Sequence, residues 1–155
     1  MNSAWGGTGI ALLTLKTVIR MTADQALCHL FFHFARQDGQ FDEAEIDFIA
    51  AKTVALGLQT SIDFKTEVGQ YIQSRKEWTD NRAYYEYIVL IIKPVNKLAV
   101  FSWCVEICLM DELITVEEEQ LLDQLANVLE IEDAQRDTIK DLLVERKAAD
   151  LNKTY

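Results

Sequence analysis

A chain of 155 residues with a formal charge of −10 is long enough for one domain with its own hydrophobic core. Half of its residues are hydrophobic and it has one proline and six glycines, which excludes a disordered or collagen-like chain and favours helices over an all-β fold. The negative charge argues against nucleic acid as a partner and favours divalent cations or basic protein surfaces. A solvated acidic face that only keeps the protein soluble explains the same charge more simply.

Residues 1–20 differ in composition from the rest and form a predicted N-terminal extension. No positive charge precedes Lys16, so the pattern does not fit a signal peptide. Two alternatives remain: a short helix, or an upstream tail that packs loosely because translation begins at Met21. Residues 21–150 are the predicted helical domain, and residues 151–155 are a short C-terminal tail.

Helix-start signals divide the first half of the domain. The Thr22–Gln25 segment has the capping-box pattern and precedes an apolar helix that we expect to be central. The Asp42–Glu45 segment has the same pattern and begins a second helix, which Gly57 ends. A third helix is predicted from about residue 61, and a fourth contains Tyr84, Tyr85 and Tyr87, with some rings in the core and others exposed.

The second half repeats this order. Residues 98–109 are apolar nearly all round and predict a second central helix. Thr115 and Glu118 form a further capping box before a helix that ends near Leu129, and a last helix carries Ile139, Leu142 and Leu143 as its apolar positions. No stretch reaches the roughly 18 to 20 apolar residues that a membrane-spanning helix needs.

A shift of about 73 residues superposes the two halves. It places Asp38 on Asp111 and Glu45 on Glu118. Such a self-match predicts a duplicated helical unit. The predicted fold is therefore all-α, a single helical-bundle domain of about seven helices built from two related helical repeats.

The repeated acidic turns are the candidate metal site. Four carboxylates, from Asp38, Glu45, Asp111 and Glu118, could bind Ca²⁺ or another divalent cation through oxygen ligands. Helix capping alone explains both glutamates, whereas neither aspartate has such an explanation. An EF-hand is excluded, because the twelfth positions after the two aspartates are Ile49 and Leu122.

His29 and His33 are the only histidines and lie one helical turn apart, which is also a spacing of zinc ligands. The favoured interpretation is core or boundary histidines with local hydrogen bonds. The 73-residue shift places His33 on Glu106, so these two are further polar candidates on the central helices. A hydrolase or transferase using the imidazoles would require both of them to open into a pocket. No other catalytic motif is present, and we do not expect an enzyme.

The three cysteines all lie in apolar stretches, and an odd number without secretory features indicates a reducing cytoplasm. Cys104 and Cys108 lie one helical turn apart and could hold a soft metal. Buried small apolar side chains are the simpler interpretation.

The two acidic turns resemble those of the TerB-like family, the tellurite-resistance-associated helical domain also found beside J-domains in membrane-anchored co-chaperones. The matching segments are residues 34–45 and 108–118, and the resemblance covers most of residues 21–143. It implies an all-α fold of two related units, a cytoplasmic protein linked to tellurite or general chemical stress, and cation binding at Asp38, Glu45, Asp111 and Glu118. Glu112 replaces the turn glycine of the first motif, which weakens the case for a second, symmetric site.

Two functions follow as hypotheses. The first is a non-catalytic TerB-like domain that binds a divalent cation at the acidic turns within a stress-response assembly. The second is a metal-independent protein-interaction module whose acidic face docks a basic partner. Both predict a protein partner, no nucleic acid and no membrane span.

Overall fold

The computed structural model describes residues 21–36, 40–111 and 113–155, so the predicted N-terminal extension lies outside the described residues. The described part contains seven α-helices and no strand, which confirms the all-α prediction. The helices are α2 (Ala23–Ala35), α3 (Glu43–Ala55), α4 (Phe64–Arg75), α5 (Asn81–Ile92), α6 (Lys97–Cys108), α7 (Val116–Val128) and α8 (Asp133–Asn152). Two short 3-10 helices, η2 (Leu58–Thr60) and η3 (Leu109–Asp111), follow α3 and α6.

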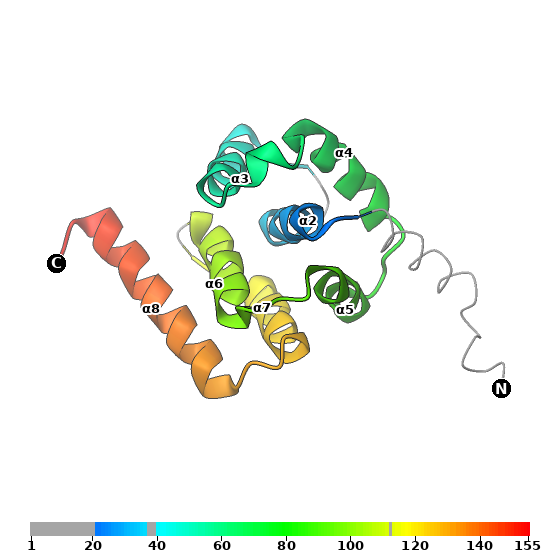
Figure 1. Cartoon of the computed structure of the whole chain (residues 1–155). Helices are drawn as coiled ribbons and strands as arrows, with labels where there is room; N and C mark the ends of the chain where they lie inside the picture. The colour runs from blue at the N-terminus through cyan, green and yellow to red at the C-terminus, as the bar shows by residue number, and fades with distance from the viewer. Residues whose placement is uncertain (1–20, 37–39, 112) are drawn as a thin grey trace, which may run out of the picture.

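Helix α2 forms the centre of the bundle. It packs against α3, α4, α5 and α6, which surround it in Figure 1. Eight of its thirteen residues are buried, including the run from Cys28 to Phe34. A helix that is apolar nearly all round can be stable only when neighbours cover every face, so the composition of α2 determines its central position.

Capping boxes begin three of the helices where the sequence predicts them. The side chains of Thr22, Asp42 and Thr115 each accept a hydrogen bond from the backbone N–H three residues later. In each case the glutamate or glutamine at that later position accepts one from the N–H of the capping residue. These local signals satisfy backbone donors that have no partner inside the helix.

The ends of α3 and α5 use left-handed residues. Gly57 has a φ of 73° and reverses the chain into η2. Lys93 has a φ of 49° and closes α5 immediately before Pro94. Pro94 therefore lies in the connection to α6 and outside both helices.

Helix α8 lies on the outside of the bundle. It packs on α6 and runs along the edge of the molecule to the C-terminus (Figure 1). Only Leu143 of its twenty residues is buried, and Leu142, an expected core position, is 55% exposed. The helix continues through Asn152, past the predicted boundary at residue 150.

The helix bounds match the predicted 73-residue shift in part. Helix α3, shifted by that amount, coincides with α7 at both ends, and α2 overlaps α6. Helix α5, shifted back by the same amount, falls on residues 8–19, which lie outside the described residues, and it packs directly on α2. The duplication itself stays a prediction from the sequence. Across the described residues, the search for a helix long and apolar enough to cross a membrane finds none.

Candidate functional site

A buried polar line runs along α2 and faces α4. His29 and Glu67 are 1% and 2% exposed, and His29 Nε2 lies 2.9 Å from Glu67 Oε1. The other oxygen, Glu67 Oε2, accepts a hydrogen bond from Gln25 Nε2 at 3.0 Å. The hydrogen bond with His29 is the main cause that lowers the pKa of the Glu67 carboxyl, against the effect of burial. Glu67 is therefore held as a buried, hydrogen-bonded carboxylate.

His33, one turn further along α2, bridges two tyrosines. Its Nδ1 lies 3.1 Å from the Tyr71 hydroxyl, and its Nε2 lies 3.1 Å from the Tyr85 hydroxyl. Burial, together with a smaller effect of the Arg75 charge, lowers the pKa of His33 to about 3. The imidazole is thus neutral at physiological pH, with one ring nitrogen donating and the other accepting.

Both imidazoles are closed off from solvent, as the favoured interpretation of core histidines predicts, and the open pocket that a hydrolase or transferase would require is not found at them. His33 is 1% exposed, like His29, and both rings pack against aromatic side chains such as Tyr71. The prediction that some rings of the tyrosine cluster are exposed is wrong. Tyr84, Tyr85 and Tyr87 are all buried, because α5 lies between α2 and α7.

The cysteines follow the simpler interpretation. Cys28, Cys104 and Cys108 are free thiols in the buried core. Burial raises the pKa of Cys28 to about 12 and raises the pKa values of the other two as well. A protonated, enclosed thiol is a small apolar side chain and not a ready metal ligand.

The acidic turns come together around Glu45, at the start of α3. Glu45 is 2% exposed, and its Oε1 accepts the backbone N–H of Asp42 at 2.9 Å. Burial is the main cause that raises the pKa of Glu45, and the charges of Asp42 and Asp111 raise it further. Arg36 acts in the opposite direction. The end of η3 and the start of α3 therefore place carboxylates of both turns within electrostatic reach of each other.

The other predicted ligands differ from Glu45 in exposure and in their hydrogen-bond partners. Asp111 is exposed at the end of η3, and Glu118 is half-buried, with its Oε1 on the Thr115 N–H at 2.9 Å. The negative charge of Glu118 contributes to the raised pKa of Cys108. Asp38 lies outside the described residues. In the described ranges, no group of three or more His, Cys, Asp or Glu side chains is arranged to hold a metal ion.

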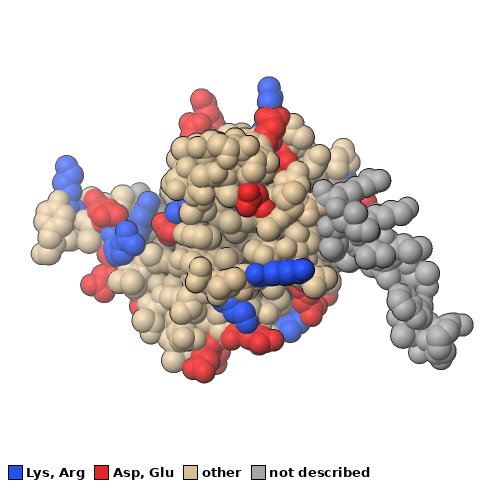
Figure 2. Space-filling view, in the orientation of Figure 1, with Lys and Arg blue, Asp and Glu red and all other residues tan. Residues whose placement is uncertain are grey.

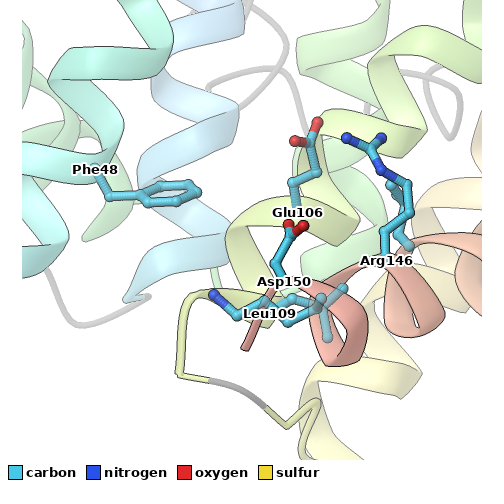
Figure 3. A pocket seen from close by; sticks show the side chains of 7 residues that line it. Phe48, Glu106, Leu109, Arg146 and Asp150 are labelled. Carbon is cyan, nitrogen blue, oxygen red and sulfur yellow. The ribbon is translucent and has the colours of Figure 1, made fainter. Parts of the chain in front are cut away.

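Glu106, the polar candidate on α6, has a partner on α3. Its Oε1 lies 3.1 Å from Lys52 Nζ, and the two side chains are 33% and 16% exposed. It also lines a small hollow between α3, α6 and α8 (Figure 3). The environment of His33 is unlike this one, since its partners are two tyrosines in the core.

Two basic residues of α8 neutralise part of the acidic second half. Lys140 Nζ lies 2.9 Å from Glu119 Oε1 and 3.1 Å from Asp123 Oδ1, so it ties α8 to α7. Arg136 Nε lies 3.6 Å from Asp123 Oδ1 and 2.9 Å from Asp137 Oδ1. Acidic and basic side chains are interspersed on the face seen in Figure 2, including the α8 side at its left.

Sequence reasoning missed Glu67, Lys52 and the two tyrosine partners of His33. Each of these contacts joins residues that are far apart in the chain, 38 and 52 positions in the case of the histidines. A glutamate on an amphipathic helix has the usual pattern of an exposed residue. Only the polar residues on the otherwise apolar α2 and α6 indicated that partners should exist.

The comparisons with known proteins identify the family. The family profile described as "Tellurite resistance protein TerB" matches residues 24–141, which is more than half of the chain. No curated protein matches the chain, and no solved structure does. The matched region extends from the first turn of α2 into α8 and includes both acidic turns. The chain therefore belongs to the TerB family of tellurite resistance proteins.

Proposed function

We propose that this TerB domain is a non-catalytic binding domain of a tellurite or general stress response, and that its acidic turns bind a divalent cation such as Ca²⁺. The proposed ligands are Glu45 and Asp111, and Glu118 is included because it is the counterpart of Glu45 in the repeated motif. Asp38 enters the proposal from the sequence motif alone.

The observation that carries the proposal is the raised pKa of Glu45. A carboxylate that is buried beside other carboxylates is unstable in its charged form, and a divalent cation relieves both the burial and the repulsion. Its Oε1 is occupied by the helix cap, whereas no described residue donates a hydrogen bond to Oε2. Oxygen ligands from carboxylates are those that Ca²⁺ and Mg²⁺ prefer.

Thermal unfolding with Ca²⁺, Mg²⁺, Mn²⁺ and Zn²⁺ tests this proposal. A cation that binds only the folded state stabilises it by about 2.7 kcal/mol at a hundred times its Kd, so Tm rises with concentration. The double variant Asp38→Asn with Asp111→Asn should lose the rise. Asp141→Asn, an exposed change on α8, should keep it. An unchanged Tm with all four cations, or an equal rise in the double variant, would overturn the proposal.

The second candidate is a metal-independent module that docks a basic partner on its acidic face. It is favoured by the first turn of α7, where three consecutive glutamates, Glu117 to Glu119, follow the cap. Lys140 contacts Glu119, while Glu117 is exposed without an ion pair from the described residues.

A lysine-rich peptide probes this second function. The affinity for the peptide should decrease steeply with salt, should not change when a chelator is added, and should decrease in the Glu117→Lys variant. Binding that a chelator abolishes would instead support the cation proposal. The two functions are therefore separable in one titration series.

A further inference from the structure

A hollow of about 160 Å³ lies between α3, α6 and α8, on the side of α6 where α8 packs (Figure 3). Its wall combines charged and apolar side chains from all three helices. They are Phe48, Glu106, Leu109, Leu143, Arg146, Lys147 and Asp150. The hollow is small, so any occupant must be a small molecule or a fragment of one.

The charges around the hollow favour an anion. Lys52 already pairs with Glu106 at 3.1 Å, so this carboxylate is neutralised from α3. Arg146 and Lys147 on α8 have no ion pair with any described residue. The lining side chains include two positive groups, Arg146 and Lys147, and two negative groups, Glu106 and Asp150. Because Lys52, outside the wall, pairs with Glu106, the charges left on the wall are those of Arg146, Lys147 and Asp150. This leaves one positive charge in excess at the hollow, in a chain whose net charge is −10.

The apolar part of the wall favours a ligand with an apolar group that can be buried against it. Leu109 and Leu143 are 4% and 8% exposed and form part of the core beneath the hollow. The ring of Phe48 projects from α3 toward the space between the helices, opposite the charged side chains of α8 (Figure 3). A bare inorganic anion would leave this apolar surface in contact with water.

We propose that this hollow binds a small organic monocarboxylate with a short apolar tail. Arg146 presents a planar pair of N–H donors that matches a carboxylate, and Lys147 adds a second positive charge. The tail packs against Phe48 and Leu143. A phosphate dianion is disfavoured, because Asp150 would repel its second charge and its oxygens would meet apolar groups.

This inference does not depend on the cation proposal. None of the hollow's lining residues is among the proposed cation ligands. Ligand binding is therefore measured in buffer that contains a chelator, and the cation titration is measured without any carboxylate. A failed carboxylate experiment therefore leaves the cation proposal unaffected, and a failed cation titration leaves the carboxylate proposal unaffected.

The experiment uses the full chain and valerate as the probe, with protein and ligand NMR signals followed up to about 10 mM, because so small a ligand binds weakly. Valeramide and pentylamine are the neutral and cationic counterparts, and acetate lacks the tail. Arg146→Gln removes the carboxylate donor at an exposed position, and circular dichroism checks that the variant folds. Lys76→Gln, an exposed cation beyond the end of α4, is the matched control.

Saturable valerate binding is expected, with shifted resonances around Phe48 and weaker binding of acetate, valeramide and pentylamine. Arg146→Gln should weaken binding about tenfold or more, because hydrogen bonds to charged groups contribute that much. Lys76→Gln should bind normally. The proposal is overturned if valerate does not saturate, if valeramide binds equally well, or if Arg146→Gln keeps the affinity.

Discussion

His33 links the packing of the core to pH. Its imidazole is neutral in the folded state, where its pKa is about 3, and its ordinary pKa is about 6.5 when unfolded. Between these values the unfolded chain binds more protons, so the free energy of unfolding falls as pH falls below about 6.5. The loss should reach roughly 2 kcal/mol at pH 5. Urea denaturation between pH 7 and 5 measures this slope.

His33→Asn is the test of that assignment. Asparagine keeps an acceptor and a donor for Tyr71 and Tyr85 but does not titrate. The variant is expected to be less stable at pH 7, because it fills the site poorly, yet to lose most of the slope between pH 6.5 and 5. A variant with the wild-type slope would show that another group causes the acid sensitivity.

Glu67 should change the free energy of unfolding in a separate and more acidic pH range. Its pKa is lowered in the folded state, mainly by the hydrogen bond with His29, so its contribution is present above the unfolded pKa of about 4.3 and is lost as pH falls below it. Glu67→Gln removes this acidic step in thermal melts while the step between pH 6.5 and 5 remains. Loss of both steps together would mean that Glu67 and His33 titrate as one unit.

The two histidines show how far residue-level prediction reaches. Their spacing and the apolar surroundings in the sequence predicted core or boundary positions, and both are in the core. Their partners were expected to be local, whereas Glu67, Tyr71 and Tyr85 come from other helices. A hydrogen bond between helices depends on how the helices pack, and no pattern within one helix contains that information.

At the scale of the element, the capping boxes were the most predictable features, because all their atoms lie within four consecutive residues. Their strength differs with burial. The bond from the Glu45 N–H to Asp42 is part-buried, whereas the equivalent bond from Glu118 to Thr115 is exposed. Asp42→Ala should therefore cost about 1 to 2 kcal/mol, and Thr115→Ala nearer 0.5 to 1 kcal/mol.

Urea denaturation of the two capping variants at neutral pH checks the order. Asp63, which precedes α4 without a side-chain capping bond, supplies the control. Asp63→Ala should cost less than either capping variant. Equal losses at the two capped sites would show that burial of Glu45 does not strengthen its cap.

Helix α8 was the element whose placement the sequence predicted least well. Leu143 is the one residue of this helix that is buried in the core, and ion pairs of Lys140 and Arg136 connect the helix to α7. Lys140→Met should destabilise the protein by at most about 1 kcal/mol, and high salt should remove the difference from wild type, because exposed ion pairs are weak and screened. A loss that persists in high salt would instead assign packing of the lysine stem as the cause. Thermal melts at low and high salt distinguish the two.

For the whole molecule, the helical class was predictable from composition and periodicity, and so were the number and order of the helices in the described residues. The arrangement around α2 was not. The repeat pattern pairs α2 with α6 but says nothing of α5, which packs on α2 and supplies Tyr85 to His33. That helix lies outside the segments that the self-match superposes, so the match does not predict where it packs.

The central position of α2 makes the two halves dependent on each other. Phe34 stacks on Tyr85 of α5 with ring centroids 5.7 Å apart, and Phe31 meets Trp103 of α6 at 6.3 Å. A fragment of residues 21–79 contains α2 without these neighbours and exposes its apolar face, so we expect weak helicity and no cooperative melting. The fragment of residues 80–155 should behave likewise, because α5 and α6 lose the helix that both of them contact.

Mixing the fragments should restore helical signal and a cooperative transition. Phe34→Ala in the first fragment should weaken this complementation, whereas Lys65→Ala, an exposed change on α4, should not. A first fragment that melts cooperatively alone would instead show that the first three helices form an autonomous unit.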